Sequence, residues 1–364
     1  MQSTDIAYYT YIYAKVDEQR YQTVTSWTKC ATLFGRSACG IVAQLTTSYG
    51  LLDYEQLNYL TIGACSLAAV WACFLPPVEQ SIYFNKRSNP PSMGATSISI
   101  INLGDSSKNR NEKTGQPENL VSPTTGALSF GAKLRHAYSL LWSDFLQAYS
   151  NRRVVKWSLW WALATCGYIQ VVHNIHLLWI HAVEAQHLPK DTKIYNGAVE
   201  AIDTLTSAVM VAGIGTLRLN WSLLGEPILA IFSLIEGLLL VAFCISYKLW
   251  VLYAARIAFG VIFHSIITIA NFEVAKRIAK DSKGLIFGIN SFFALLFQTI
   301  LTLVVIAWLK LHITSQFIIY GAYYGVLGLL FAVMSVLTIT KVVRSKNPVA
   351  LWITKSYECD TMVK

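Results

Sequence analysis

The sequence predicts an all-α integral membrane protein whose helices fall into two blocks. Hydrophobic residues make up 54% of the 364 residues and charged residues only 13%, whereas soluble domains carry about 25% charged residues. Apolar stretches of about 20 residues recur along the chain, and each can cross a hydrocarbon core of about 30 Å. A long polar segment separates three apolar segments from six later ones. We therefore expect about nine membrane helices.

The first block contains one short and two full-length apolar segments. Residues 4–16 are too few to span a membrane alone and fit the inner part of a helix, whereas residues 24–49 and 57–75 are long enough. We take residues 1–76 as an incomplete N-terminal bundle. Because the chain begins inside an apolar segment, we expect an N-terminally truncated protein.

The polar segment and the second block follow. Residues 77–152 form a linker that is rich in Ser, Asn, Pro and Gly over residues 88–126, so we expect it to be largely disordered. Near its end, residues 134–149 place apolar side chains at helical spacing, which predicts an amphipathic helix on the inner leaflet or a structural strut. A six-helix bundle is expected over residues 153–342, with a tail at 343–364. The six spans are 154–180, 195–217, 223–245, 249–275, 285–309 and 316–340.

The positive charge is explained by orientation in the membrane. The formal net charge is +9, and basic residues gather in the linker, in the tail and in alternate connections between spans. One such connection holds Lys276, Arg277, Lys280 and Lys283, whereas the next holds only Lys310. The positive-inside rule places the linker and the C-terminus in the cytosol. The predicted partner is therefore the lipid bilayer and not a nucleic acid.

Polar side chains inside the predicted spans are candidates for a functional site, because each is costly unless it faces a cavity or a partner. Asp5 lies eleven residues from the inner end of its segment, which corresponds to roughly 16 Å of depth. Gln298 lies at a similar depth, while His173 and Glu200 lie nearer the outer ends of their spans. These positions predict one aqueous cavity.

Structural interpretations of the same residues remain open. Asp5 could pair with Lys29, Glu200 and Asp203 could be anions near a helix end, and His173 could be a neutral core histidine. A set of ion pairs that fixes helix packing is expected among Glu236, Arg256, His264 and Glu273.

Several stretches resemble the reduced folate carrier and thiamine transporter family, a branch of the major facilitator fold. In the first block they are IAYYTYIY, LNYLTIGACSL and the FLPP–SIYF exit from the third segment. In the second block they are WSLWWALATCGY, IYNGAVEA and GLIFGINSFFALLFQTI. The resemblance implies a major-facilitator-type helical bundle of twelve spans, of which the first three here would be the fourth to sixth. We therefore expect that the 364-residue chain does not transport by itself.

The resemblance also assigns roles to residues. Asp5 takes the place of an acidic residue, usually Glu, that faces the substrate cavity, and Tyr8 lies beside it. Members that carry folate have basic residues where this chain has Gly260 and Gln298, and Gln298 is similar to the thiamine-carrying pattern. Thiamine-carrying members have Asn at the position of His173. The resemblance thus favours thiamine slightly over reduced folates.

We expect a vitamin transporter of the plasma membrane, not an enzyme, that works by alternating access through a central cavity. It needs no cofactor or metal, and its coupling partner would be a proton or an exchanged anion. A carboxylate would hold the substrate, and tyrosines would stack on its ring. The residues expected to line the cavity are Asp5, Tyr8, Tyr168, His173, Glu200 and Gln298.

Two other classes of function remain open. One is a vitamin sensor or receptor that does not transport and signals through the long linker. The other is an intramembrane metalloenzyme that uses His173 with His176 and Glu200 with Asp203, since each pair has a spacing that suits metal binding.

Overall fold

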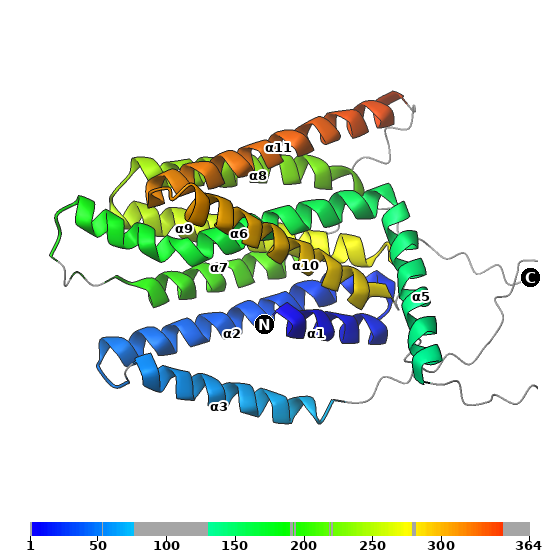
Figure 1. Ribbon diagram of the computed structural model, residues 1–364, viewed down its shortest axis with the longest axis horizontal. Helices are drawn as coiled ribbons and strands as arrows, with labels where there is room; N and C mark the ends of the chain where they lie inside the picture. Colours follow the sequence, from blue (N-terminus) through cyan, green and yellow to red (C-terminus); the bar gives the residue numbers. More distant parts are fainter. Residues whose placement is uncertain are drawn as a thin grey trace, which may run out of the picture. The chain divides into compact units, whose positions relative to one another are not determined.

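A computed structural model describes residues 2–52, 54–75, 130–189, 192, 194–217, 219, 221–278 and 282–344. The described residues are helical apart from short connections (Figure 1). The chain divides into two units, one made of Met1–Val78 with Asp144–Lys364 and the other of Glu79–Ser143. The stretch predicted to be disordered, residues 88–126, lies outside the described residues, as does nearly all of the predicted tail.

The first block begins with a short helix and continues with two longer ones. They are α1 (Gln2–Lys15), the 3₁₀ turn η1 (Glu18–Arg20), α2 (Tyr21–Ser48) and α3 (Tyr54–Ala72). The chain leaves α2 through Gly50, whose φ of 63° suits a residue without a side chain. Large apolar side chains of α3, such as Leu67 and Trp71, are exposed.

The second block contains six long helices, one for each predicted span. They are α6 (Arg152–Ala185), α7 (Asn196–Thr216), α8 (Trp221–Ile245), α9 (Leu249–Ala275), α10 (Lys283–Thr302) with the π-helical η3 (Leu303–Trp308), and α11 (Ile313–Arg344). The side chain of Asn151 caps α6 by accepting a hydrogen bond from the backbone N–H of Arg153 at 3.0 Å.

Five helices of the described part of the chain are long and apolar enough to cross a membrane: α7, α8, α9, α10 with η3, and α11. The remaining helices are shorter or more polar. The 14-residue α1 is too short, and α2 carries Lys29 and Arg36 along its length. By their length and composition, these five helices indicate a multi-pass membrane protein.

The two most extensive helix contacts within Met1–Val78 and Asp144–Lys364 are those of α11 with α8 and of α2 with α7 (Figure 1). Helix α7 also contacts α9, and α10 contacts α6 and α1. A Cβ atom on Gly40 of α2 would lie 3.0 Å from the carbonyl oxygen of Gly197 on α7. Glycine at both positions therefore lets the two backbones approach closely, as in other membrane bundles. This contact attaches the first block to the second.

The end of α5 (Phe130–Ser150) acts as a strut for α10. The Tyr149 hydroxyl donates a hydrogen bond to Asn290 Oδ1 at 2.8 Å, and the Ser282 hydroxyl donates to Asp144 at 3.1 Å. Burial raises the pKa of Tyr149 to about 12, so its hydroxyl stays protonated at neutral pH and remains a donor. Of the two interpretations of this segment, these contacts favour the strut.

The predicted set of ion pairs among Glu236, Arg256, His264 and Glu273 is wrong. Glu273 pairs instead with Lys276 and Arg277. It follows Arg256 by 17 residues, which separates them by about 26 Å along α9. The two carboxyl oxygens of Glu236 have no hydrogen-bond partner among the described residues.

Candidate functional site

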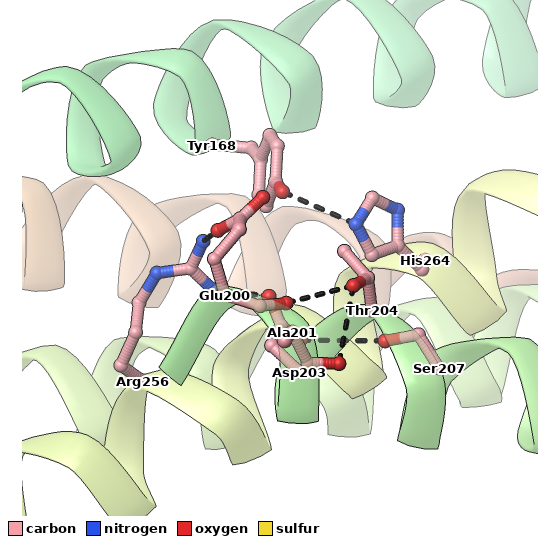
Figure 2. A network of polar contacts seen from close by, with 8 residues as sticks. All are labelled: Tyr168, Glu200, Ala201, Asp203, Thr204, Ser207, Arg256 and His264. Carbon is pink, nitrogen blue, oxygen red and sulfur yellow. Dashed lines mark hydrogen bonds and ion pairs between the residues drawn. The ribbon is translucent and has the colours of Figure 1, made fainter. Parts of the chain in front are cut away.

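A buried arginine on α9 holds two acidic residues of α7 (Figure 2). Nη1 of Arg256 lies 2.8 Å from Oδ2 of Asp203, and Nη2 lies 3.3 Å from Oε2 of Glu200. The two acids are three residues apart, so they share one face of α7, as their spacing predicts. A buried guanidinium needs such partners, and its planar array of donors suits two carboxylates.

Asp203 fits beside Arg256 because residue 260 is a glycine. Gly260 lies one turn beyond Arg256 on α9, and a Cβ atom there would collide with the Asp203 carboxylate. The Ser207 hydroxyl donates a further hydrogen bond to Oδ1 of Asp203 at 3.3 Å. The carboxylate of Asp203 is therefore fully enclosed between α7 and α9.

Glu200 is the most solvent-exposed of these three charged residues. Its side chain is 36% exposed, compared with 0% for Asp203 and 3% for Arg256. Two carboxylates and one guanidinium leave a net charge of −1 when all three are ionised, and Glu200 carries the part that solvent or a ligand can reach. This arrangement can bind a cation or a hydrogen-bond donor.

Tyr168 of α6 completes the network. Its ring stacks on Phe263 with centroids 3.8 Å apart, its hydroxyl lies 3.1 Å from Nε2 of His264, and Cζ of Arg256 lies 5.9 Å from its ring centroid. Figure 2 shows Tyr168 between Arg256 and His264. The side chain is buried. In this structure Tyr168 stacks on Phe263 and thereby holds α6 against α9, the helix that also carries Arg256.

The α1 candidates lie apart from this network. Asp5 is exposed, and Tyr8 is 48% exposed. Within the described residues Asp5 makes no ion pair at 4.0 Å or less, although it lies within electrostatic range of Lys29. Lys29 and Arg36 of α2 lie within electrostatic range of His264. Helix α2 therefore brings two bases toward the side of the network that contains His264.

His173 and Gln298 lie outside the network around Arg256. His173 is exposed, and it follows Tyr168 by five residues, which turns it about 140° around α6. The Gln298 amide nitrogen lies 3.2 Å from Oε1 of Gln170 and 3.1 Å from the hydroxyl of Thr302. The structure thus joins Tyr168 and Glu200 in one contact network. That all six candidates line one chamber stays a prediction.

The residues proposed for a metal site are not gathered around one point. Glu200 and Asp203 both bind Arg256, and His176 packs its ring edge-on to Trp179. Nowhere in the described ranges do three or more His, Cys, Asp or Glu side chains form a group that could hold a metal ion.

Comparison with known proteins decides the family. The reduced folate carrier family model matches residues 1–319. The chain belongs to the reduced folate carrier family. This confirms the family resemblance carried by the sequence motifs, and with it the expectation of a membrane carrier that is not an enzyme.

This reduced folate carrier family member is similar to vitamin transporters along most of its length. It is 34% identical over 352 residues to thiamine transporter 1 of Homo sapiens, covering 93% of this chain and 69% of that protein. It is 34% identical over 339 residues to thiamine transporter 2 of Mus musculus, covering 92% and 68%. Folate transporter 1 of Caenorhabditis elegans is 32% identical over 332 residues, covering 91% and 68%.

Sequence reasoning missed part of the network in this family member. The sequence pattern predicts other ion-pair partners for Arg256 and indicates no role for Arg36 or Phe263. A signal existed for the two arginines, because a base inside a membrane span is a functional candidate by default. The aromatic Phe263 carries no such signal in an apolar helix.

Proposed function

We propose that this reduced folate carrier family member transports a vitamin across a membrane and prefers thiamine to reduced folates. Both kinds of vitamin transporter are among its relatives, and thiamine transporters reach slightly higher identity, 34% against 32%. Identity alone does not separate the two substrates, so the chemistry of the site must.

The half-exposed carboxylate of Glu200 carries the preference for thiamine. Together with Asp203 and Arg256 it forms a group with a net charge of −1. The low dielectric constant of the surrounding protein strengthens the attraction of that charge for a cation. Thiamine has a cationic thiazolium ring, whereas a folate brings the carboxylates of its glutamate. Lys29 and Arg36 on α2 are the bases that would bind the carboxylates of a folate. These two residues therefore favour the competing prediction, that the substrate is a reduced folate.

The proposed mechanism is alternating access in a major-facilitator-type bundle, with about nine membrane helices in this chain. The substrate would occupy a central cavity, and the coupling partner would be a proton or an exchanged anion. The protein would lie in the plasma membrane with its linker and C-terminus in the cytosol. The residues proposed to line the cavity are Asp5, Tyr8, Tyr168, His173, Glu200 and Gln298.

Equilibrium binding of radiolabelled thiamine and of a reduced folate to the purified 364-residue chain in nanodiscs tests the preference. We expect thiamine to bind more tightly. Glu200→Gln should weaken thiamine binding about tenfold, or about 1.4 kcal/mol, because it removes the only accessible charge of the group. The control is Glu184→Gln, at an exposed position near the end of α6 and outside the network.

Two results would contradict the preference: tighter binding of the folate, or unchanged thiamine binding in Glu200→Gln. The alternative function, a vitamin sensor, makes a separate prediction. Uptake is measured in proteoliposomes with this chain and with any longer form that its gene encodes. Binding without uptake in all of them would favour the sensor.

A further inference from the structure

A buried lysine joins the first block to the start of α10. Lys283 is the first residue of α10, and its side chain has 0% exposure. Its ammonium nitrogen lies 3.7 Å from the ring centroid of Tyr21 and 5.0 Å from that of Tyr13. Tyr13 lies near the end of α1, and Tyr21 begins α2. One cation of the second block thus contacts two aromatic rings of the first.

The two rings are held in place for this contact. They meet edge-on with centroids 4.8 Å apart, and the hydroxyl of Tyr13 is 2.5 Å from that of Thr25. The ring of Phe287, one turn beyond Lys283, lies 5.9 Å from the Tyr13 ring. A preorganised pair of aromatic faces attracts an ammonium group most strongly when water is excluded, as it is here.

The position of Lys283 makes this contact easy to reverse. The N-terminus of a helix carries a partial positive charge, so a lysine in the first turn is disfavoured. Burying its charge adds a desolvation cost. The attraction to the rings of Tyr13 and Tyr21 contributes to offsetting these costs. An ammonium group buried at such a cost is suited to a contact that forms and breaks.

Close packing surrounds the lysine contact. A Cβ atom on Gly284 would lie 3.7 Å from Cβ of Thr10 on α1. The residue before Lys283, Ser282, donates its hydroxyl to Asp144 near the end of α5. The start of α10 therefore touches α1, α2 and the end of α5.

We propose that Lys283 with Tyr13 and Tyr21 forms a latch that closes the inner end of the transport path. This proposal rests on the proposed transport function, because a carrier must close one end while the other is open. While the ammonium group lies between the rings, α10 is held against α1 and α2. Release of Lys283 lets these helix ends separate and opens the path on that side.

Labelling of a single cysteine at Thr10 tests the latch without any transport. The native cysteines are replaced by serine or alanine, the purified chain is placed in nanodiscs, and the rate of reaction of Thr10→Cys with a water-soluble maleimide is measured. Lys283→Met keeps the length of the side chain but removes the charge. We expect it to raise the labelling rate about tenfold, since a desolvated cation–π contact is strong enough for such a shift. Lys283→Arg should keep the rate low.

The matched control is Lys276→Met. The ammonium nitrogen of Lys276 lies 4.9 Å from the Phe272 ring centroid and 3.5 Å from Glu273, contacts that stay within the end of α9. Loss of this cation–π contact should leave the labelling rate unchanged. If Lys276→Met raised the rate as much as Lys283→Met, the effect would be general loosening, and the latch proposal would be wrong.

Two further measurements keep the proposal testable if Lys283→Met does not fold. Tyr21→Leu should raise the labelling rate, whereas Tyr21→Phe, which keeps the ring, should not. Thr10→Cys combined with Gly284→Cys should form a disulfide under mild oxidation, because a Cβ distance of 3.7 Å suits one. Equal rates in the two Tyr21 variants, or no disulfide, would overturn the latch. Failure of vitamin binding alone would overturn the proposed function and leave these results unaffected.

Discussion

The most constrained residue of the site is a glycine. Gly260 leaves the space that the Asp203 carboxylate fills beside Arg256, and even one methyl group there would collide with it. We expect Gly260→Ala to displace Asp203 and weaken its ion pair with Arg256. Breaking a buried pair costs about 3–5 kcal/mol, so the thermal unfolding midpoint of the detergent-purified chain should fall clearly.

The control for this residue is Gly213→Ala on α7, where an added Cβ atom meets nothing within 4 Å. It should leave the unfolding midpoint unchanged or raise it slightly, because alanine favours a helix more than glycine does. Equal midpoints for the two variants would show that Asp203 can move without cost.

At the scale of elements, the contact between α2 and α7 positions Glu200. Gly40 packs against Gly197, and the Ser37 hydroxyl donates to the carbonyl oxygen of Ala201 at 2.9 Å. Gly40→Val should push α2 away from the turn of α7 that carries Glu200. We expect thiamine affinity to fall about tenfold, because displacement by about 1 Å disrupts a positioned group. Equilibrium binding checks this.

Gly35→Val on the same helix is the matched control, because an added Cβ atom at Gly35 meets nothing within 4 Å. Valine is equally unfavourable for the helix at either position, so a difference between the variants reports the contact with α7. Equal losses of affinity would mean that helix propensity, and not packing, controls the site.

For the whole molecule, the length of the apolar segments predicted the six helices of the second block, and the helix period predicted that Glu200 and Asp203 share a face. Which side chains of different helices contact each other could not be predicted from segment length or helix period. The sequence pattern groups Arg256 with Glu236, His264 and Glu273, because an apolar run does not specify which helix lies beside it. It predicts Lys283 only as a cytosolic charge, whereas the structure buries this side chain.

The orientation of the whole molecule makes a final prediction. Basic residues concentrate on alternate connections, and moving them across the membrane is unfavourable, so the tail should face the cytosol. In intact cells a membrane-impermeant maleimide should not label Cys359 when the other native cysteines are replaced, and labelling should appear only after permeabilisation. Lys248→Cys, in the connection between α8 and α9, should be labelled without permeabilisation, because that connection belongs to the opposite side. Labelling of Cys359 in intact cells would reverse the orientation and place the Lys283 latch at the outer end of the path.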